Sequence, residues 1–182
     1  MKIRIQNVRL AFPNLFNATK VGDDDKPAFS ASFLLPKDHP QIAEINAAID
    51  QVAKDKWGAK ADAQLKAMRA ADKTALHNGD LKAQYSGFEG MLYISARNPV
   101  RPTTLNRDKS PVTESDGIIY AGCYVNAVLE IWAQDNKYGK RVNATLSGVQ
   151  FNRDGDAFTG GGAASEDDFD DLEVGADAEE LV

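Results

Sequence analysis

The sequence predicts a mainly β domain with a helical insertion and an acidic tail. Apolar and polar residues alternate in about five segments, which is the period of a half-buried strand. Residues 40–72 instead show helical spacing, and the last seventeen residues, Glu166–Val182, hold nine carboxylates and no Lys or Arg. About five strands with one insertion are typical of a small closed or partly open barrel. A flat α+β sandwich is the alternative, because periodicity alone does not decide whether a sheet closes.

The length of 182 residues fits one domain and a tail. We expect residues 1–158 to fold as the domain, and residues 159–182 to form a flexible linker with Gly160–Gly162 and a disordered acidic tail. The chain has a net charge of -6, but without the nine tail carboxylates it holds 18 acidic and 21 basic residues and a net charge of +3. The pattern indicates a mildly basic body that carries a tethered polyanion. A solubility tail and an interaction tail both fit this pattern.

Composition excludes several classes of protein. The single cysteine, Cys123, excludes an internal disulfide and is consistent with a reducing cytoplasm, where we expect the protein to act. Two histidines and one cysteine are too few for an ordinary zinc site, and no Gly-rich phosphate loop or nucleophile–base set is present. No apolar run approaches the roughly 20 residues that cross a bilayer. The sequence therefore predicts no cofactor, metal or membrane partner, and nothing in it argues for an enzyme.

The first strands follow from alternation near the N-terminus. The apolar positions there are Ile3 and Ile5, and then Val8, Leu10 and Phe12. The change of register between the two sets predicts a β-bulge near Gln6-Asn7. Residues 18–27 read as a polar loop, and Phe29 to Leu35 read as a second strand that ends at Pro36.

Two helices follow. Asp38 or His39 with Pro40 is a plausible helix start, and the helix is expected to end near Trp57-Gly58. Its apolar face is formed by Ile42, Ile45, Ile49 and Val52. A second, Ala-rich helix is expected over 60–72, and residues 77–90 read as loop.

The C-terminal half reads as three strands. The first covers Met91 to Arg97, and a long irregular loop over 98–117 follows it. The second covers 118–133, with a bend at Gly122, and its odd-numbered positions are all apolar, which makes them the core face. A hairpin turn at 136–139 leads to a returning strand whose core residues are Val142, Ala144 and Leu146.

The polar side of this sheet is both aromatic and basic. The strand at 118–133 places Tyr120, Tyr124 and Trp132 on its mixed face, and Tyr93 lies on the polar side of its own strand. Cations accompany these rings on the first strand, in the 98–117 loop and on the last strand. Aromatic faces that stack on bases and cations that follow phosphates are typical of single-stranded nucleic-acid binding. The alternative is that the tyrosines pack under the helices.

The hairpin tip gives a sharper indication of the same kind. Tyr138 lies between Lys137 and the pair Lys140-Arg141, at a position where no core is expected. An aromatic residue among cations at a tip indicates base stacking, although an ordinary polar turn would also fit.

Four segments together resemble bacteriophage single-stranded DNA-binding proteins. They are the Lys-Ile-Arg-Ile start, the strand FSASFLLP, the hairpin GCYVNAVLEIWAQDNKYGKRVNATLSGVQF and the acidic tail. The resemblance implies an OB fold with extra helices, hence an OB-fold-like five-stranded barrel. It also implies sequence-tolerant single-stranded DNA binding in phage replication, recombination or repair, in the cytoplasm of the host cell. The DNA-binding residues that we expect are Lys2, Arg4, Tyr93, Arg97, Arg101, Arg107, Tyr120, Tyr124, Lys137, Tyr138, Lys140 and Arg141.

The tail is expected to compete for the DNA groove and to recruit phage or host replication proteins. The segment expected to carry these contacts is Asp167, Asp168, Phe169, Asp170, Asp171, Leu172 and Glu173. The chain ends in Glu180-Leu181-Val182, without the terminal aromatic residue of the better-known bacterial proteins. A structural or adaptor protein of a phage particle is the main alternative, and a metal-dependent nuclease is a weaker one.

Overall fold

The computed structural model describes residues 1–20, 26–158, 169–170 and 172. The strands are β1 (Lys2–Thr19), β2 (Ala28–Pro36), β3 (Leu76–Asn78), β4 (Met91–Asn98), β5 (Thr103–Leu105), β6 (Tyr124–Asn136) and β7 (Gly139–Arg153). The helices are α1 (Ile42–Trp57) and α2 (Ala61–Ala70), with short 3₁₀ helices η1 (Gly58–Lys60), η2 (Gly79–Lys82) and η3 (Glu114–Asp116).

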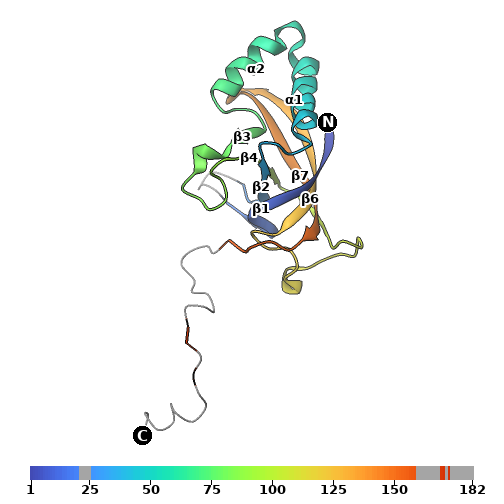
Figure 1. Ribbon diagram of the computed structural model, residues 1–182. Helices are drawn as coiled ribbons and strands as arrows, with labels where there is room; N and C mark the ends of the chain where they lie inside the picture. The colour runs from blue at the N-terminus through green and yellow to red at the C-terminus, as the bar shows by residue number, and fades with distance from the viewer. Residues whose placement is uncertain (21–25, 159–168, 171, 173–182) are drawn as a thin grey trace.

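The sheet closes into a barrel. Its strand order is β3-β4-β2-β1-β6-β7-β5, and β4 also pairs in parallel with β7 through Arg97 and Thr145. This pairing joins β1, β2, β4, β7 and β6 into a closed ring of five strands (Figure 1). The predicted OB-fold-like barrel is therefore confirmed, and the flat sandwich is excluded.

Strand β1 changes register at three points, and the first two accompany a positive φ. The pairing with β6 shifts between Ile5 and Val8, and Asn7 takes a φ of 55°, so the predicted bulge is confirmed. The pairing with β2 shifts again after Ala11, and Phe12 takes a φ of 49°. Ala11 is consequently buried and Phe12 is 50% exposed, so Phe12 does not join Val8 and Leu10 in the core although it continues their apolar series. The second irregularity moves its ring to the outside of the barrel.

The two predicted helices are confirmed and cover one end of the barrel (Figure 1). Helix α1 buries Ile45 and Ile49 in the main core, and it ends at Gly58, whose φ of 55° is accessible to glycine at little cost. Trp57 donates its indole N–H to Asp135 Oδ2 at 3.0 Å. This contact ties the end of α1 to the β6–β7 hairpin.

Both predicted long loops contain short structured elements. Within 77–90 the chain forms most of β3 and all of η2, and within 98–117 it forms β5 and η3. Each of the two strands has three residues, paired with β4 and β7 respectively. Three residues are too few to show a period, so these strands depend on the neighbour that they pair with.

Strand β6 begins at Tyr124 and not at Ile118 as predicted, because the chain turns at Gly122, where φ is 107°. A Cβ at Gly122 would lie 2.2 Å from the Asp156 carbonyl oxygen, so the C-terminal part of the domain crosses there. The predicted core face of β6 is confirmed from Cys123 to Ile131, whose odd-numbered side chains are all buried.

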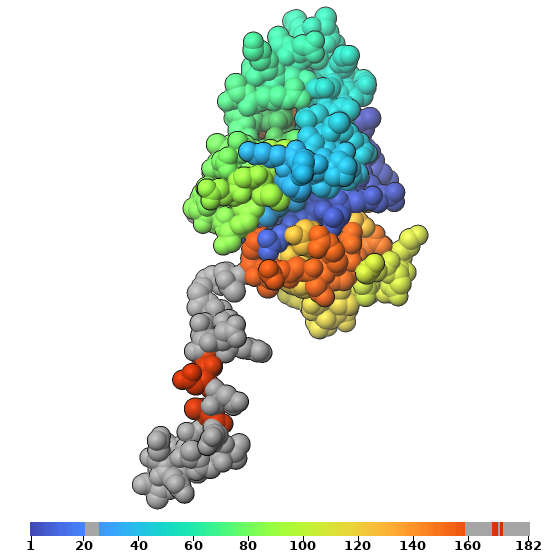
Figure 2. Space-filling model, viewed as in Figure 1, coloured from blue at the N-terminus to red at the C-terminus, as the bar shows by residue number. Residues whose placement is uncertain are grey.

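Residues 153–158, here called the C-terminal strap, lie against the barrel. Phe158 donates its backbone N–H to Ala121 O at 3.0 Å, and Arg9 donates to Asp156 O at 2.6 Å. The Arg9 guanidinium also lies 4.1 Å from the centre of the Phe158 ring. In the space-filling view the orange C-terminal end of the barrel chain lies beside the blue β1 (Figure 2).

The domain boundary at residue 158 stays a prediction. Neither helix is long and apolar enough to cross a membrane, within the part of the chain that the structure describes.

Candidate nucleic-acid interface

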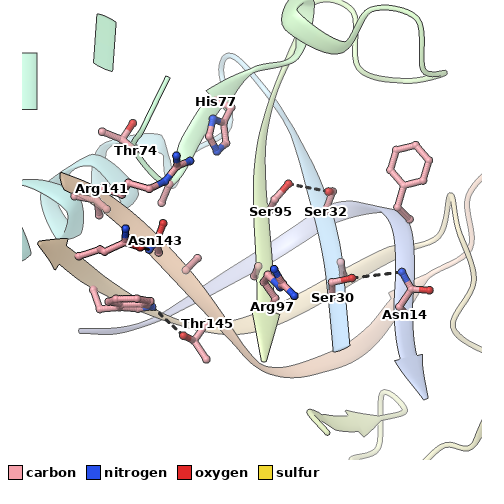
Figure 3. A pocket seen from close by; sticks show the side chains of 18 of the residues that line it. Asn14, Ser30, Ser32, Thr74, His77, Ser95, Arg97, Arg141, Asn143 and Thr145 are labelled. Atoms are coloured by element: carbon pink, nitrogen blue, oxygen red, sulfur yellow. Dashed lines mark hydrogen bonds between the residues drawn. The ribbon is translucent and has the colours of Figure 1, made fainter. Parts of the chain in front are cut away.

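A groove of about 650 Å³, here called the main groove, crosses the barrel between β4 and β7. The two strands pair only at Arg97 and Thr145 and separate from there (Figure 3). Side chains from β1, β2, β4 and β7 surround the opening, and segment 74–77 closes its far end. Barrel closure therefore brings together strands that are far apart in the sequence.

The main groove is cationic. Arg97 on β4, Arg141 on β7 and Lys82 on η2 line it, and no Asp or Glu among the described residues does so. None of these three side chains forms a salt bridge within the described ranges. Their charge is therefore available to an anion, and a groove lined by one sign of charge concentrates ligands of the opposite sign.

Polar side chains cover the strands between these cations. Ser32 and Ser95 share a hydrogen bond at 3.0 Å, and Asn14 donates to Ser30 Oγ at 3.4 Å (Figure 3). Hydroxyl and amide groups both donate and accept hydrogen bonds. This surface can therefore contact phosphate, sugar or base edges with little preference among bases.

Two exposed aromatic rings border the groove. Trp132 on β6 is 42% exposed, and its indole N–H donates to Thr145 Oγ1 at 3.0 Å, which fixes the orientation of the ring. Phe12 on β1 is 50% exposed and packs edge-on against Tyr85, with 5.0 Å between ring centres. Exposed rings of this kind are platforms for base stacking.

These two rings were absent from the predicted site. The sequence did place Trp132 on the mixed face of its strand, so a signal for it existed. Phe12 had none, because its outward position depends on a positive φ in a non-glycine residue, which is rare.

The predicted hairpin tip lies at the end of β6 and β7, beyond Gln134 and Arg141. Tyr138 is 75% exposed, as expected of a tip without a core, and the Lys137 ammonium lies 5.1 Å from its ring centre. Lys140 is half-buried at the start of β7. The tip is therefore available for contact, and a DNA-binding role for it stays a prediction.

Tyr93 is only 3% exposed, so the prediction that it faces solvent is wrong. Strand β3 pairs His77 with Tyr93, and the two rings stack with centres 4.9 Å apart. Phe88 covers another side at 5.2 Å. Burial, and then the charge of Asp72, raise the pKa of the Tyr93 phenol. The polar side of β4 is covered here by residues of segment 77–90, which was predicted to be a loop.

Tyr120 and Tyr124 lie outside the main groove and hold the C-terminal strap. The Tyr120 hydroxyl lies 2.8 Å from Asp154 Oδ1 and 3.2 Å from Gly155 N. The Arg153 guanidinium lies 3.6 Å from the centre of the Tyr124 ring. Both rings therefore have a structural role in the domain, which alternation along the strand could not predict.

Four predicted cations also lie outside the main groove. Lys2 and Arg4 line a separate depression of about 410 Å³, here called the second groove, together with Lys109. Arg107 lies next to it, because its carbonyl accepts from Gln150, which lines the second groove. Arg101 instead lies 5.5 Å from the centre of the Phe16 ring. Arg97 and Arg141 thus line the same groove, and Lys2, Arg4, Arg101 and Arg107 do not line it.

Only part of the predicted tail segment can be placed. Phe169 and Leu172 are 71% and 67% exposed, and Asp170 is exposed too. Asp167, Asp168, Asp171 and Glu173 lie outside the described residues. No group of three or more His, Cys, Asp or Glu side chains in the described part of the chain could hold a metal ion.

A five-stranded barrel with a groove over its second and third strands, next to the hairpin of its last two, is the arrangement of an OB-fold domain that binds oligonucleotides. A family profile described as the ssDNA-binding protein of Enterobacter phage Enc34 matches residues 1–182. The chain belongs to this family, and the predicted resemblance to phage single-stranded DNA-binding proteins is confirmed.

The chain is also similar to individual phage proteins. Protein p50 of Acyrthosiphon pisum secondary endosymbiont phage 1 is 48% identical over 185 residues, which cover 100% of this chain and 99% of p50. The single-stranded DNA-binding protein of phage Enc34, solved in complex with ssDNA, is 30% identical with a TM-score of 0.72, over 87% of this chain and 89% of that one. The single-stranded DNA-binding protein gp2.5 of bacteriophage T7 is 9% identical with a TM-score of 0.55, over 90% and 98% of the chains, and shares the fold.

Proposed function

We propose that the protein binds single-stranded DNA in the main groove without sequence preference and protects it during phage DNA replication, recombination or repair. The observation that carries the proposal is the composition of this groove. Arg97, Arg141 and Lys82 line it, no carboxylate from the described part of the chain does so, and exposed Trp132 and Phe12 border it. The Enc34 relative solved with ssDNA supports the same ligand.

The groove offers a separate contact to each part of a single strand. Arg97 and Arg141 lie on different strands of the barrel and bind phosphates, which supplies affinity that depends on salt. Trp132 and Phe12 stack on bases, which every base tolerates because every base has a π-face. At the tip of the hairpin, Tyr138 adds a further ring and Lys137 a further cation. These contacts bind and position DNA, so the protein acts by occupancy and not by catalysis, in the cytoplasm of the host cell.

The acidic tail competes with DNA for the main groove. Phe158, the last described residue of the domain, packs on the cluster that contains Phe88. The Phe88 ring centre is 5.8 Å from that of Phe12, which lines the main groove. The last described residue of the domain therefore lies close to this groove, and the nine carboxylates that follow it within 24 residues of chain would have an effective concentration of roughly millimolar there. When DNA displaces the tail, the tail is free to recruit replication proteins.

Tryptophan fluorescence tests the binding directly, because the chain has two tryptophans. In Trp57→Phe the only indole is Trp132 at the main groove, and in Trp132→Phe it is Trp57 at the end of α1. Titration with oligo(dT) should quench the tryptophan fluorescence of Trp57→Phe, less so at high salt, and should leave the fluorescence of Trp132→Phe nearly unchanged. Equal quenching of both variants would place the DNA elsewhere.

The same titration separates the alternatives. Absence of binding to oligo(dT) at low salt, by quenching and by anisotropy of labelled DNA, would contradict the proposal and favour a structural protein of the phage particle. Shortening of the oligonucleotide in the presence of magnesium would show a nuclease.

A further inference from the structure

The second groove has the charge of a nucleic-acid site although it lies apart from the main groove. Lys2, Arg4 and Lys109 line it, all three are exposed, and none of its lining residues in the described ranges is Asp or Glu. No salt bridge between described residues includes any of the three. Three unpaired cations around one depression favour an anionic ligand.

The two grooves meet on the outer face of β7. Thr145 lines the main groove, and Ser147, the next outward-facing residue of β7, lines the second groove. Residues two apart in a strand are separated by about 7 Å. No part of the barrel wall therefore has to be crossed to pass from one groove to the other.

Strand β6 runs beside β7 and makes the same connection. Trp132 lines the main groove, Val128 lines the second, and Glu130 lies between them. Among the described residues of β6 and β7 that lie between the two grooves, Glu130 is the one acidic residue. The N-terminal ammonium of Met1 binds its carboxylate at 2.8 Å, which compensates the charge.

We propose that a single DNA strand that leaves the main groove at Thr145 continues over the outer face of β6 and β7 into the second groove, where Lys2, Arg4 and Lys109 bind its phosphates. This proposal rests on the proposed function. No aromatic side chain of the described chain lines the second groove, whose lining includes Val128 and Val149. The second groove therefore contributes through charge and not through stacking, and only for strands long enough to reach it.

The test compares short and long oligonucleotides on a triple variant, Lys2→Gln, Arg4→Gln and Lys109→Gln. An OB fold occupies roughly 4–16 nucleotides, so an oligo(dT) of about six fills the main groove alone and one of about 20 reaches both. Each lost phosphate contact lowers the slope of log affinity against log salt by about 0.7. The slope should fall by about 2 for the long oligonucleotide and stay unchanged for the short one.

A matched variant controls for net charge. Lys54→Gln, Lys60→Gln and Lys66→Gln remove the same charge from exposed positions on α1, η1 and α2, and Gln has nearly the helix propensity of Lys. This control should leave both slopes unchanged. If the first triple variant melts below the wild type, the three single variants replace it, each with an expected fall of about 0.7 for the long oligonucleotide.

Two results would overturn the continuous path. One is an unchanged slope for the long oligonucleotide, and the other is an equal fall for both lengths, which would show a general effect of charge. If the long-oligonucleotide slope is unchanged while the triple variant loses binding to a peptide of residues 166–182, the second groove binds an acidic peptide instead. If the wild type does not bind the short oligonucleotide, the proposed function fails, which is a different result from failure of the path.

Discussion

Replacement of Arg97 and Arg141 by Gln should weaken single-stranded DNA binding and reduce the dependence of the affinity on salt concentration. The two side chains come from different barrel strands and have no carboxylate partner in the described part of the protein, so each is expected to neutralise a separate phosphate. Contacts without shared partners are close to additive. Each should contribute about 0.7 to the slope of log affinity against log salt, and the double variant should lose about 1.4.

This slope corresponds to a measurable change in affinity. Over a fourfold rise in salt, one such contact reduces the binding constant by a factor of about 2.6, and two reduce it by about 7. Fluorescence anisotropy of labelled oligo(dT) at several salt concentrations measures the slope. Arg69→Gln is the control, because Arg69 pairs with Asp50 at 3.1 Å on the helical layer and should not affect the slope. If the double variant keeps the wild-type slope, Arg97 and Arg141 do not bind phosphates and the main groove is not the DNA site.

Three further predictions concern other parts of the chain. Tyr138→Ala should weaken oligo(dT) binding by about 1–3 kcal/mol, and Tyr138→Phe should change it little, because the face of the ring stacks on the base. Equal oligo(dT) affinities of the two variants would exclude stacking. Tyr93→Ala should lower the free energy of unfolding by roughly 3–5 kcal/mol in denaturant titrations, as for other buried aromatic residues. The folded molecules of this variant should bind DNA as the wild type does, and weaker binding by them would contradict the prediction. Deletion of Glu166–Val182 should raise DNA affinity most at low salt, where screening is weakest, and unchanged affinity there would leave the tail a role in solubility.

Much of the fold could be predicted because the pattern of burial is local. The odd-numbered residues of β6 from Val125 to Ile131 are all buried, as their alternation predicted, and Ile45 and Ile49 of α1 are buried as helical spacing predicted. The short strands β3 and β5 could not be predicted, because three residues carry no period. Because β3 was not predicted, the burial of Tyr93, whose side chain β3 covers, was not predicted either.

The candidate site was harder to predict than the fold, because closure of the barrel decides which outward-facing residues lie together. In a flat sheet, all side chains on the polar face share one surface, and Lys2, Arg4, Arg97 and Arg141 would be neighbours. In a closed barrel the outward direction turns with each strand. Arg97 and Arg141 line the same groove because β4 and β7 are joined at one position, where Arg97 pairs with Thr145.

The same closure gives the protein two cationic surfaces instead of one. The first part of β1 pairs with β6, through Lys2–Glu130 and Arg4–Val128, so Lys2 and Arg4 lie at the second groove and not at the main groove. Strand β7 borders both grooves, through Thr145 in one and Ser147 in the other. A pattern of alternating residues encodes only whether a side chain points in or out. The length of DNA that the protein covers depends instead on how far around the barrel the outward-facing cations are spread, and that follows from the strand order.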